Sequence, residues 1–159
     1  AKRDWSFAPE YVEVISLMLQ QEKPRDLVIG TGESHTVREF IETSFNYAGI
    51  ELEWKDSDVN EKGIVKSCEK KIEPNVKPGD VLIEIDPRYY RPTEVDFLLA
   101  DISKAKKELN WTPRVKFKEL AQIMTDYDLI NQGYEPPGKG IRNVKDKGLD
   151  WTNHEFIDN

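Results

Sequence analysis

Residues 89–96 read Tyr-Tyr-Arg-Pro-Thr-Glu-Val-Asp and bring together side chains that can bind phosphate and sugar groups. The guanidinium of Arg91 is a planar fork of donors that fits two phosphate oxygens at once. Glu94 can accept hydrogen bonds from both hydroxyls of a ribose, and Pro92 fixes the turn between the two side chains. The segment therefore predicts a ligand that carries phosphates and a ribose. The alternative is a surface ion pair of Arg91 with Glu94 or Asp96, because ion pairs across three residues are common.

The elements that position this segment are predicted from periodicity and capping signals. An apolar run, Val81–Ile85, predicts a buried strand that ends just before it. Upstream, apolar residues in steps of three and four predict a helix over Pro9–Gln21 with Tyr11, Val12, Ile15, Met18 and Leu19 on its core face. A capping box of Thr36 and Glu39 starts a second helix that Gly49 ends. The other expected elements are strands at Asp26–Gly30 and Glu51–Trp54, a helix capped by Asp101, and a helix from Phe117 with Leu120, Ile123, Met124, Tyr127 and Ile130 as its core face.

Two long segments are predicted to be irregular. Residues 55–79 are polar and rich in glycine, proline and asparagine, so they predict a surface loop with only a brief strand at Ile64-Val65. Beyond Gly133 the sequence cannot continue a helix as far as Gly140, and the following residues show no sustained period. We expect one domain over residues 1–133 and a C-terminal tail over residues 134–159. Trp151 and Phe156 could pin this tail to its own domain or to a neighbouring subunit; the alternative is disorder.

Composition limits the class of protein. The chain has 159 residues, 38% of them hydrophobic, and a net charge of -7. This balance disfavours binding to nucleic acid or to an anionic membrane, and no window approaches the roughly 18 apolar residues of a membrane span. The expected compartment is cytoplasmic. Cys68 is the single cysteine and is expected to be an incidental thiol rather than a nucleophile, and the two histidines lack metal-ligand spacing.

Three motifs in a fixed order resemble a known family. Asp4-Trp5, the segment Gly32–Phe40 and the segment 89–96 together are similar to the C-terminal half of the GDP-mannose 4,6-dehydratases, which are extended short-chain dehydrogenases. The resemblance runs from residue 1 to about Ile130. It implies an α/β, α+β-like fold: the smaller, substrate-binding lobe of such an enzyme, without the complete Rossmann domain. Because the chain starts without a methionine at a point where the family is already halfway through its length, we expect a fragment.

The resemblance also implies roles for individual residues. Arg91 and Arg3 would clamp the diphosphate of GDP-mannose, Glu94 would hold the ribose, and Tyr90, with Tyr89, would shape the wall of the site. His35 and Arg38 are further candidates, with a solvated surface role as the alternative. Arg88 is a weaker third candidate for a basic contact.

The catalytic half of the family pattern is missing. The sequence contains no Gly-x-Gly-x-x-Gly turn and no Tyr-x-x-x-Lys pair. The parent family is an NADP-dependent lyase on the route to GDP-fucose. We expect neither bound NADP nor activity from this chain alone. Implied partners are a nucleotide-binding Rossmann half or other subunits, with a homo-oligomer expected. Two alternatives stay open: a naturally short binding module of a split enzyme, or part of a related UDP- or dTDP-sugar epimerase or dehydratase.

Overall fold

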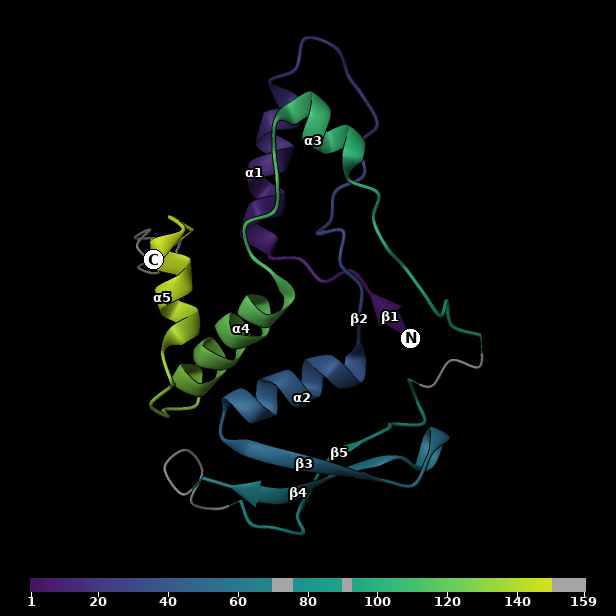
Figure 1. Ribbon diagram of the computed structural model, residues 1–159, viewed down its shortest axis with the longest axis vertical. Helices are drawn as coiled ribbons and strands as arrows, with labels where there is room; N and C mark the ends of the chain where they lie inside the picture. The colour runs from purple at the N-terminus through teal and green to yellow at the C-terminus, as the bar shows by residue number, and fades with distance from the viewer. Residues whose placement is uncertain (70–75, 90–92, 150–159) are drawn as a thin grey trace.

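The computed structural model describes residues 1–69, 76–89 and 93–149. Over these residues the chain is a small α/β structure with five α-helices and two small antiparallel sheets. In Figure 1, α2 lies between α4 and the three-stranded sheet, and α1 and α3 stand at the opposite end of the molecule. The helices are α1 (Ala8–Leu19), α2 (Val37–Tyr47), α3 (Ser103–Leu109), α4 (Phe117–Asn131) and α5 (Lys139–Asp146), and the strands are β1 (Lys2–Arg3), β2 (His35–Thr36), β3 (Ile50–Lys55), β4 (Lys62–Cys68) and β5 (Val81–Glu84).

The capping signals of α2 act as predicted. The Thr36 hydroxyl accepts a hydrogen bond from the Glu39 amide at 3.0 Å, and the Glu39 carboxylate accepts one from the Thr36 amide at 2.6 Å. These bonds satisfy two amides that a helix start otherwise leaves free, and they lower the pKa of Glu39. Gly49, at φ +79°, ends the helix and turns the chain into β3.

The three-stranded sheet has the order β3-β4-β5. The brief strand predicted at Ile64-Val65 is confirmed, but the loop predicted around it is wrong in its centre, because seven residues form β4, the middle strand. Gly63 and Val65 are the buried positions of β4. The alternation of a buried strand face is therefore present, but its first buried residue is a glycine, which is rare inside strands. The predicted edge strand is confirmed as β3. The strand predicted at Val81–Ile85 is confirmed as β5 but is an edge strand, with Val81 45% exposed, rather than a buried one.

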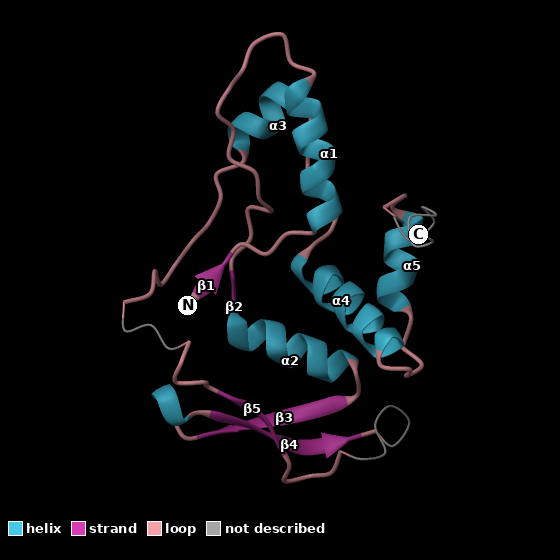
Figure 2. Cartoon of the chain, turned by 180° about the vertical axis from the view of Figure 1, so that it is seen from behind, coloured by secondary structure: helices cyan, strands magenta, loops and turns pink. Residues whose placement is uncertain are grey.

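The strand predicted at Asp26–Gly30 is absent. Val28 is 56% exposed, and the amides of Thr31 and Gly32 bind the carboxylate of Asp4 instead of a neighbouring strand. An apolar run forms a strand only where another strand can take up its backbone bonds, and the described part of the chain provides none here. Seen from behind in Figure 2, this segment is a loop next to the long connection from β5 to α3.

The two predicted helix faces are only partly buried. In α1 the buried positions are Glu10 and Val14, whereas Val12, Ile15 and Leu19 are 67%, 54% and 81% exposed. In α4, Leu120 and Ile123 are buried as predicted, and Tyr127 packs partly buried against the core. Met124 and Ile130 are each 45% exposed, which contradicts their predicted core role. Each helix therefore presents its core face at a different angle from the one that sequence periodicity indicates.

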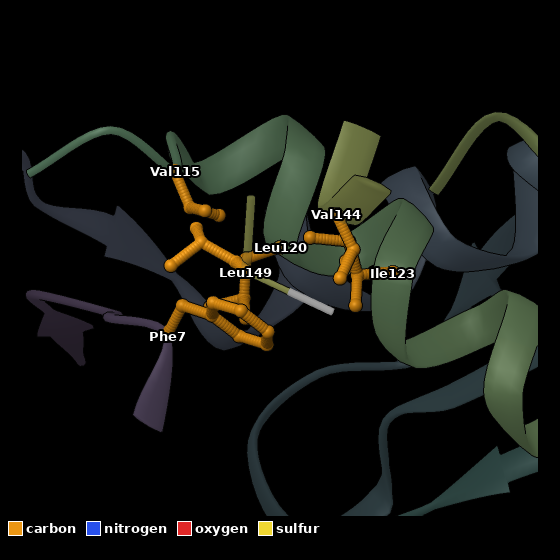
Figure 3. Packing of buried hydrophobic residues seen from close by; sticks show 6 residues of the cluster. All are labelled: Phe7, Val115, Leu120, Ile123, Val144 and Leu149. Atoms are coloured by element: carbon orange, nitrogen blue, oxygen red, sulfur yellow. The ribbon is translucent and has the colours of Figure 1, made fainter. Parts of the chain in front are cut away.

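The main core cluster joins three parts of the chain (Figure 3). It consists of Phe7, Val115, Leu120, Ile123, Val144 and Leu149. Two of its members belong to α5 and the turn after it, an element that the sequence analysis did not predict. Asp101 behaves nearly as expected: its carboxylate accepts the Ser103 amide at 3.0 Å, one residue before the helix cap at Ile102.

Candidate functional site

Arg3 and Glu94, two of the predicted substrate-binding residues, lie in direct contact. The Arg3 guanidinium donates to the Glu94 carboxylate at 2.5 Å and to the Val95 carbonyl at 2.7 Å. Both side chains are partly exposed, at 24% for Arg3 and 39% for Glu94. The pair therefore remains accessible to a ligand that competes for either partner.

Backbone pairing of β1 brings these distant residues together. Lys2 and Arg3 pair with β2 on one side. On the other side the Lys2 amide donates to the Asp96 carbonyl at 2.7 Å, and the Lys2 carbonyl accepts the Leu98 amide at 3.2 Å. The first residues of the chain thus lie between β2 and the segment that carries Glu94.

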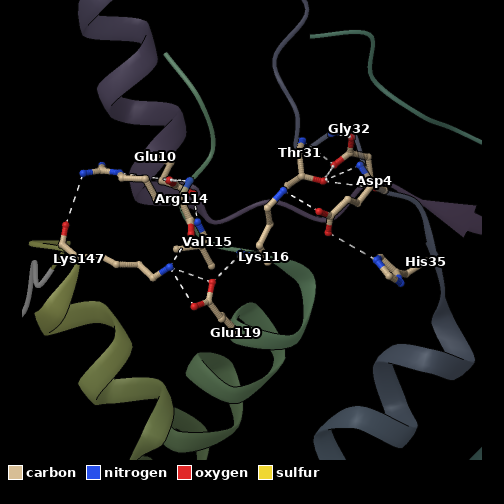
Figure 4. A network of polar contacts seen from close by, with 11 residues as sticks. Asp4, Glu10, Thr31, Gly32, His35, Arg114, Val115, Lys116, Glu119 and Lys147 are labelled. Carbon is tan, nitrogen blue, oxygen red and sulfur yellow. Dashed lines mark hydrogen bonds and ion pairs between the residues drawn. The ribbon is translucent and has the colours of Figure 1, made fainter. Parts of the chain in front are cut away.

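Asp4 fixes the same arrangement from the next position (Figure 4). Its carboxylate accepts the Thr31 amide at 2.8 Å, the Thr31 hydroxyl at 2.6 Å, the Gly32 amide at 2.9 Å and the Ala100 amide at 3.4 Å. Gly30 completes the junction, since a side-chain carbon there would lie 2.8 Å from an Asp4 oxygen and would collide with Ala100. One carboxylate therefore connects the N-terminal segment, the turn at residues 30–32 and the connection that follows Glu94.

A cleft of about 470 Å³ borders the β1–β2 pair at Ala1 and Thr36. Arg38 lies on its wall, 4.3 Å above the ring of Trp54, and forms an ion pair with Glu61. The Trp54 indole nitrogen donates to Glu42 at 2.7 Å, which fixes the ring. The cleft is lined by Ala1, Thr36, Val37, Arg38, Ile41, Trp54, Glu61, Ile83 and Ile85.

His35 faces a different part of the molecule from Arg38. Its ring stacks on Phe117 at 3.8 Å and lies 3.9 Å from Glu33 and 3.8 Å from Glu39. It lines a second cleft, of about 560 Å³, between α2 and α4. The backbone of His35 pairs with Arg3 across β1 and β2, but its side chain lines this second cleft, whereas Arg38 lines the cleft that reaches Ala1.

The remaining predicted residues differ in what can be said of them. Tyr90 and Arg91 lie outside the described residues. Tyr89 is 78% exposed. Arg88 is bound to Asp86 through contacts of 2.6 to 3.1 Å, and this pairing lowers the pKa of Asp86 and raises that of Arg88. The weaker candidate Arg88 thus has a local carboxylate partner.

Sequence reasoning missed Trp54, Glu61 and Ile83 as parts of a site. Trp54 was predicted only as one face of an edge strand, and Glu61 lay in the predicted loop. The signal that could have found them is the β4 strand, whose pairing with β3 and β5 places all three beside α2. The described residues contain no group of three metal-ligating side chains, and none of their helices is long and apolar enough to cross a membrane.

The fold and this junction define a small α/β chain in which an arginine–carboxylate pair lies at two short antiparallel strands, and a cleft borders the same strands. Comparison with known sequences identifies the family. A sequence model described as GDP-mannose 4,6 dehydratase matches residues 1–124, and the chain belongs to this family. The resemblance predicted from its three motifs is therefore confirmed.

Individual relatives give the same result. The chain is 47% identical over 129 residues to a GDP-mannose 4,6-dehydratase of Vibrio cholerae, covering 81% of this chain and 35% of that protein. It is 48% identical to the GDP-mannose 4,6 dehydratase of Homo sapiens, over 81% of this chain and 32% of that protein. It is also 48% identical to GDP-mannose 4,6 dehydratase 1 of Arabidopsis thaliana, over 81% of this chain and 28% of that protein. The chain thus spans about a third of the length of the curated relatives it matches.

Proposed function

We propose that this chain is the GDP-mannose-binding portion of a GDP-mannose 4,6-dehydratase. In the reaction that the resemblance implies, the sugar is oxidised at C4, water is eliminated across C5 and C6, and the hydride returns to C6. The product is GDP-4-keto-6-deoxymannose. The chain contributes substrate binding to this lyase reaction, and we propose that the remaining family sequence contributes the catalytic tyrosine and lysine.

The contact between Arg3 and Glu94 carries this proposal. Two residues that family resemblance assigns to one ligand, 91 positions apart, meet at 2.5 Å and are both accessible. On binding, the Arg3 guanidinium exchanges the Glu94 carboxylate for diphosphate oxygens, and Glu94 becomes free to accept the ribose hydroxyls. Arg91 provides the second phosphate clamp and Tyr90 the wall. Arg38 supplies a further cation at the neighbouring cleft.

The NADP of the parent family does not fit the residues of this chain. Dinucleotides bind to free amides of a glycine-rich turn between a strand and a helix. The turn at residues 30–32 follows no strand in the described structure, and the amides of Thr31 and Gly32 are bound to Asp4. We therefore assign no step through NADP to this chain.

Other features support a role within a larger assembly. The apolar side chains on the open face of α1, at Val12, Ile15 and Leu19, support docking of a Rossmann half or of other subunits, and a homo-oligomer is part of the same proposal. We propose residues 1–133 as the binding lobe and residues 134–159 as its extension. The acidic composition and single cysteine support a cytoplasmic location.

Isothermal titration tests the binding function directly. The purified chain is titrated with GDP, GDP-mannose and UDP-glucose at low salt. GDP ligands should bind with a Kd of roughly micromolar to millimolar, and UDP-glucose should not bind. Arg3→Ala, Glu94→Gln and Arg91→Ala should each abolish or strongly reduce the heat.

Arg88→Ala is the matched control, because Arg88 is exposed and pairs with Asp86. Binding that survives in Arg3→Ala and Glu94→Gln would refute the assignment of these residues. Binding of UDP-glucose in place of the GDP ligands would favour a UDP-sugar enzyme. An absence of any heat would refute independent ligand binding by this chain.

A further inference from the structure

Residues 138–149 follow the part of the chain that the family sequence model matches, which ends at residue 124. In Figure 1 they form α5 and the turn after it, side by side with α4. Three separate sets of contacts bind this segment to the rest of the structure, one at each end and one in the middle. Their chemistry differs, and each can be tested by itself.

The first turn of α5 is bound by a buried carboxylate. Asp126 is fully buried in α4 and accepts the Gly138 amide at 3.1 Å and the Ile141 amide at 3.0 Å. The Tyr47 hydroxyl donates to the same carboxylate at 2.9 Å and accepts the Lys139 amide at 2.8 Å. A carboxylate at a helix start is stabilised by the helix dipole and by its free amides. Tyr47 and Asp126 together form what we term the latch.

Backbone-to-backbone packing binds the middle of α5. A side-chain carbon added to Gly140 would lie 2.5 Å from the Gln122 carbonyl carbon and 2.5 Å from the Ile123 amide nitrogen, so only glycine permits this approach. One turn later Val144 is fully buried in the core cluster beside Ile123. The two helices therefore lie in direct contact.

The far end reaches the start of α1. Leu149 joins the core cluster with Phe7. The Lys147 ammonium donates to the Arg114 carbonyl at 2.6 Å and to the Glu119 carboxylate at 3.0 Å (Figure 4). This end thus packs against Phe7, four residues after Arg3.

We propose that residues 138–149 form a strap that docks onto the α4 face of the lobe, opens as a unit, and is held closed by the latch. Its contacts are with the side chains of the latch, with the α4 backbone at Gln122 and Ile123, and with the core cluster, and the helical bonds of α4 do not depend on it. Opening therefore removes the strap without unfolding α4 or the sheet, in the manner of other local opening reactions. The open strap exposes the apolar face of Phe7, Leu120 and Ile123.

Hydrogen exchange measured by mass spectrometry on the full chain tests this proposal. Tyr47→Phe removes only the hydroxyl of the latch, and Asp126→Asn replaces its carboxylate. In each variant the amides of residues 139–149 should exchange about tenfold faster or more, because buried charge-assisted hydrogen bonds are lost. Amides of residues 7–11 should also exchange faster, while those of β3 and β4 should keep their wild-type rates.

Matched controls separate the latch from general destabilisation. Asp128→Asn changes an exposed aspartate two residues away on α4, and Tyr89→Phe removes an exposed tyrosine hydroxyl. In both control variants the amides of residues 139–149 should exchange at wild-type rates. If Asp126→Asn does not fold, Tyr47→Phe decides. Three results would overturn the proposal. They are unchanged exchange of residues 139–149 in the variants, equally faster exchange in every region, and a wild-type strap whose amides already exchange without protection.

Discussion

Replacement of Asp4 by asparagine should disrupt the junction that holds Glu94 in place. An asparagine that keeps its oxygen toward Thr31 presents an NH₂ group to the Gly32 amide, so two donors face each other. The bond lost there measures 2.9 Å and is charge-assisted, the 3.4 Å bond from the Ala100 amide to the same oxygen is lost with it, and the bonds kept at Thr31 become neutral. With about 1.5–3 kcal/mol for a hydrogen bond to a charged group, the free energy of unfolding should fall by about 2–4 kcal/mol.

Urea denaturation followed by circular dichroism measures this loss as a lower midpoint at an unchanged m-value. Under the proposed function, the Kd for GDP of the folded variant should also rise by about tenfold or more, because Val95 and Glu94 are no longer held by the ordered segment. Asp96→Asn changes an exposed carboxylate on the same segment and should alter neither quantity. An Asp4→Asn variant with the wild-type midpoint would refute the role of Asp4 as the connecting group.

Two further predictions concern the C-terminal helix. Gly140→Ala gains up to about 1 kcal/mol of helix propensity but collides with the α4 backbone, so the free energy of unfolding measured in urea should fall by about 1–3 kcal/mol. Asn143→Ala on the same helix is the control that reports helix propensity alone. A Gly140→Ala variant more stable than the wild type would contradict the close approach. Burial raises the pKa of Tyr47, and its hydrogen bond to Asp126 raises it further. The folded state therefore holds this proton more tightly than the unfolded state, so the stabilisation is complete below pH 10 and is lost as the pH rises through the folded-state pKa. Between about pH 9 and 11, the free energy of unfolding should fall more steeply with pH in the wild type than in Tyr47→Phe. Equal slopes in the two proteins would exclude this coupling.

Local signals in the sequence were sufficient for the elements that they control. The capping box of Thr36 and Glu39 and the glycine at position 49 fixed α2, because both act through bonds within a few residues. Periodicity also found α1 and α4, yet it assigned Met124 and Ile15 to the core. The face that a helix buries is decided by its neighbours, and α4 has as a neighbour α5, which the sequence analysis did not predict.

Elements that depend on distant partners were not predictable in the same way. Asp26–Gly30 has the composition of a strand, but no described strand pairs with it. Of β4 only Ile64-Val65 was predicted as a strand, because the full seven-residue strand forms through its pairing with β3 and β5 on both sides. For the site, the family motifs predicted Arg3 and Glu94, whereas the contact between them, and the cleft with Trp54, arise only from tertiary structure. The latch was missed for the same reason, since Tyr47 and Asp126 are 79 positions apart.

The pairing of β1 with the segment after Glu94 has a consequence for folding order. The Arg3–Val95 bond closes a loop of 92 residues, whereas the Trp54–Glu42 bond that fixes the cleft wall closes one of 12. Each doubling of loop length costs about 0.6 kcal/mol in closure entropy, so the longer loop costs about 2 kcal/mol more. The helix α2 and its hairpin should form early on the folding pathway, and the Arg3–Glu94 junction should form late. Nascent or partly refolded chains should therefore show native-like sheet structure before the proposed binding site has formed.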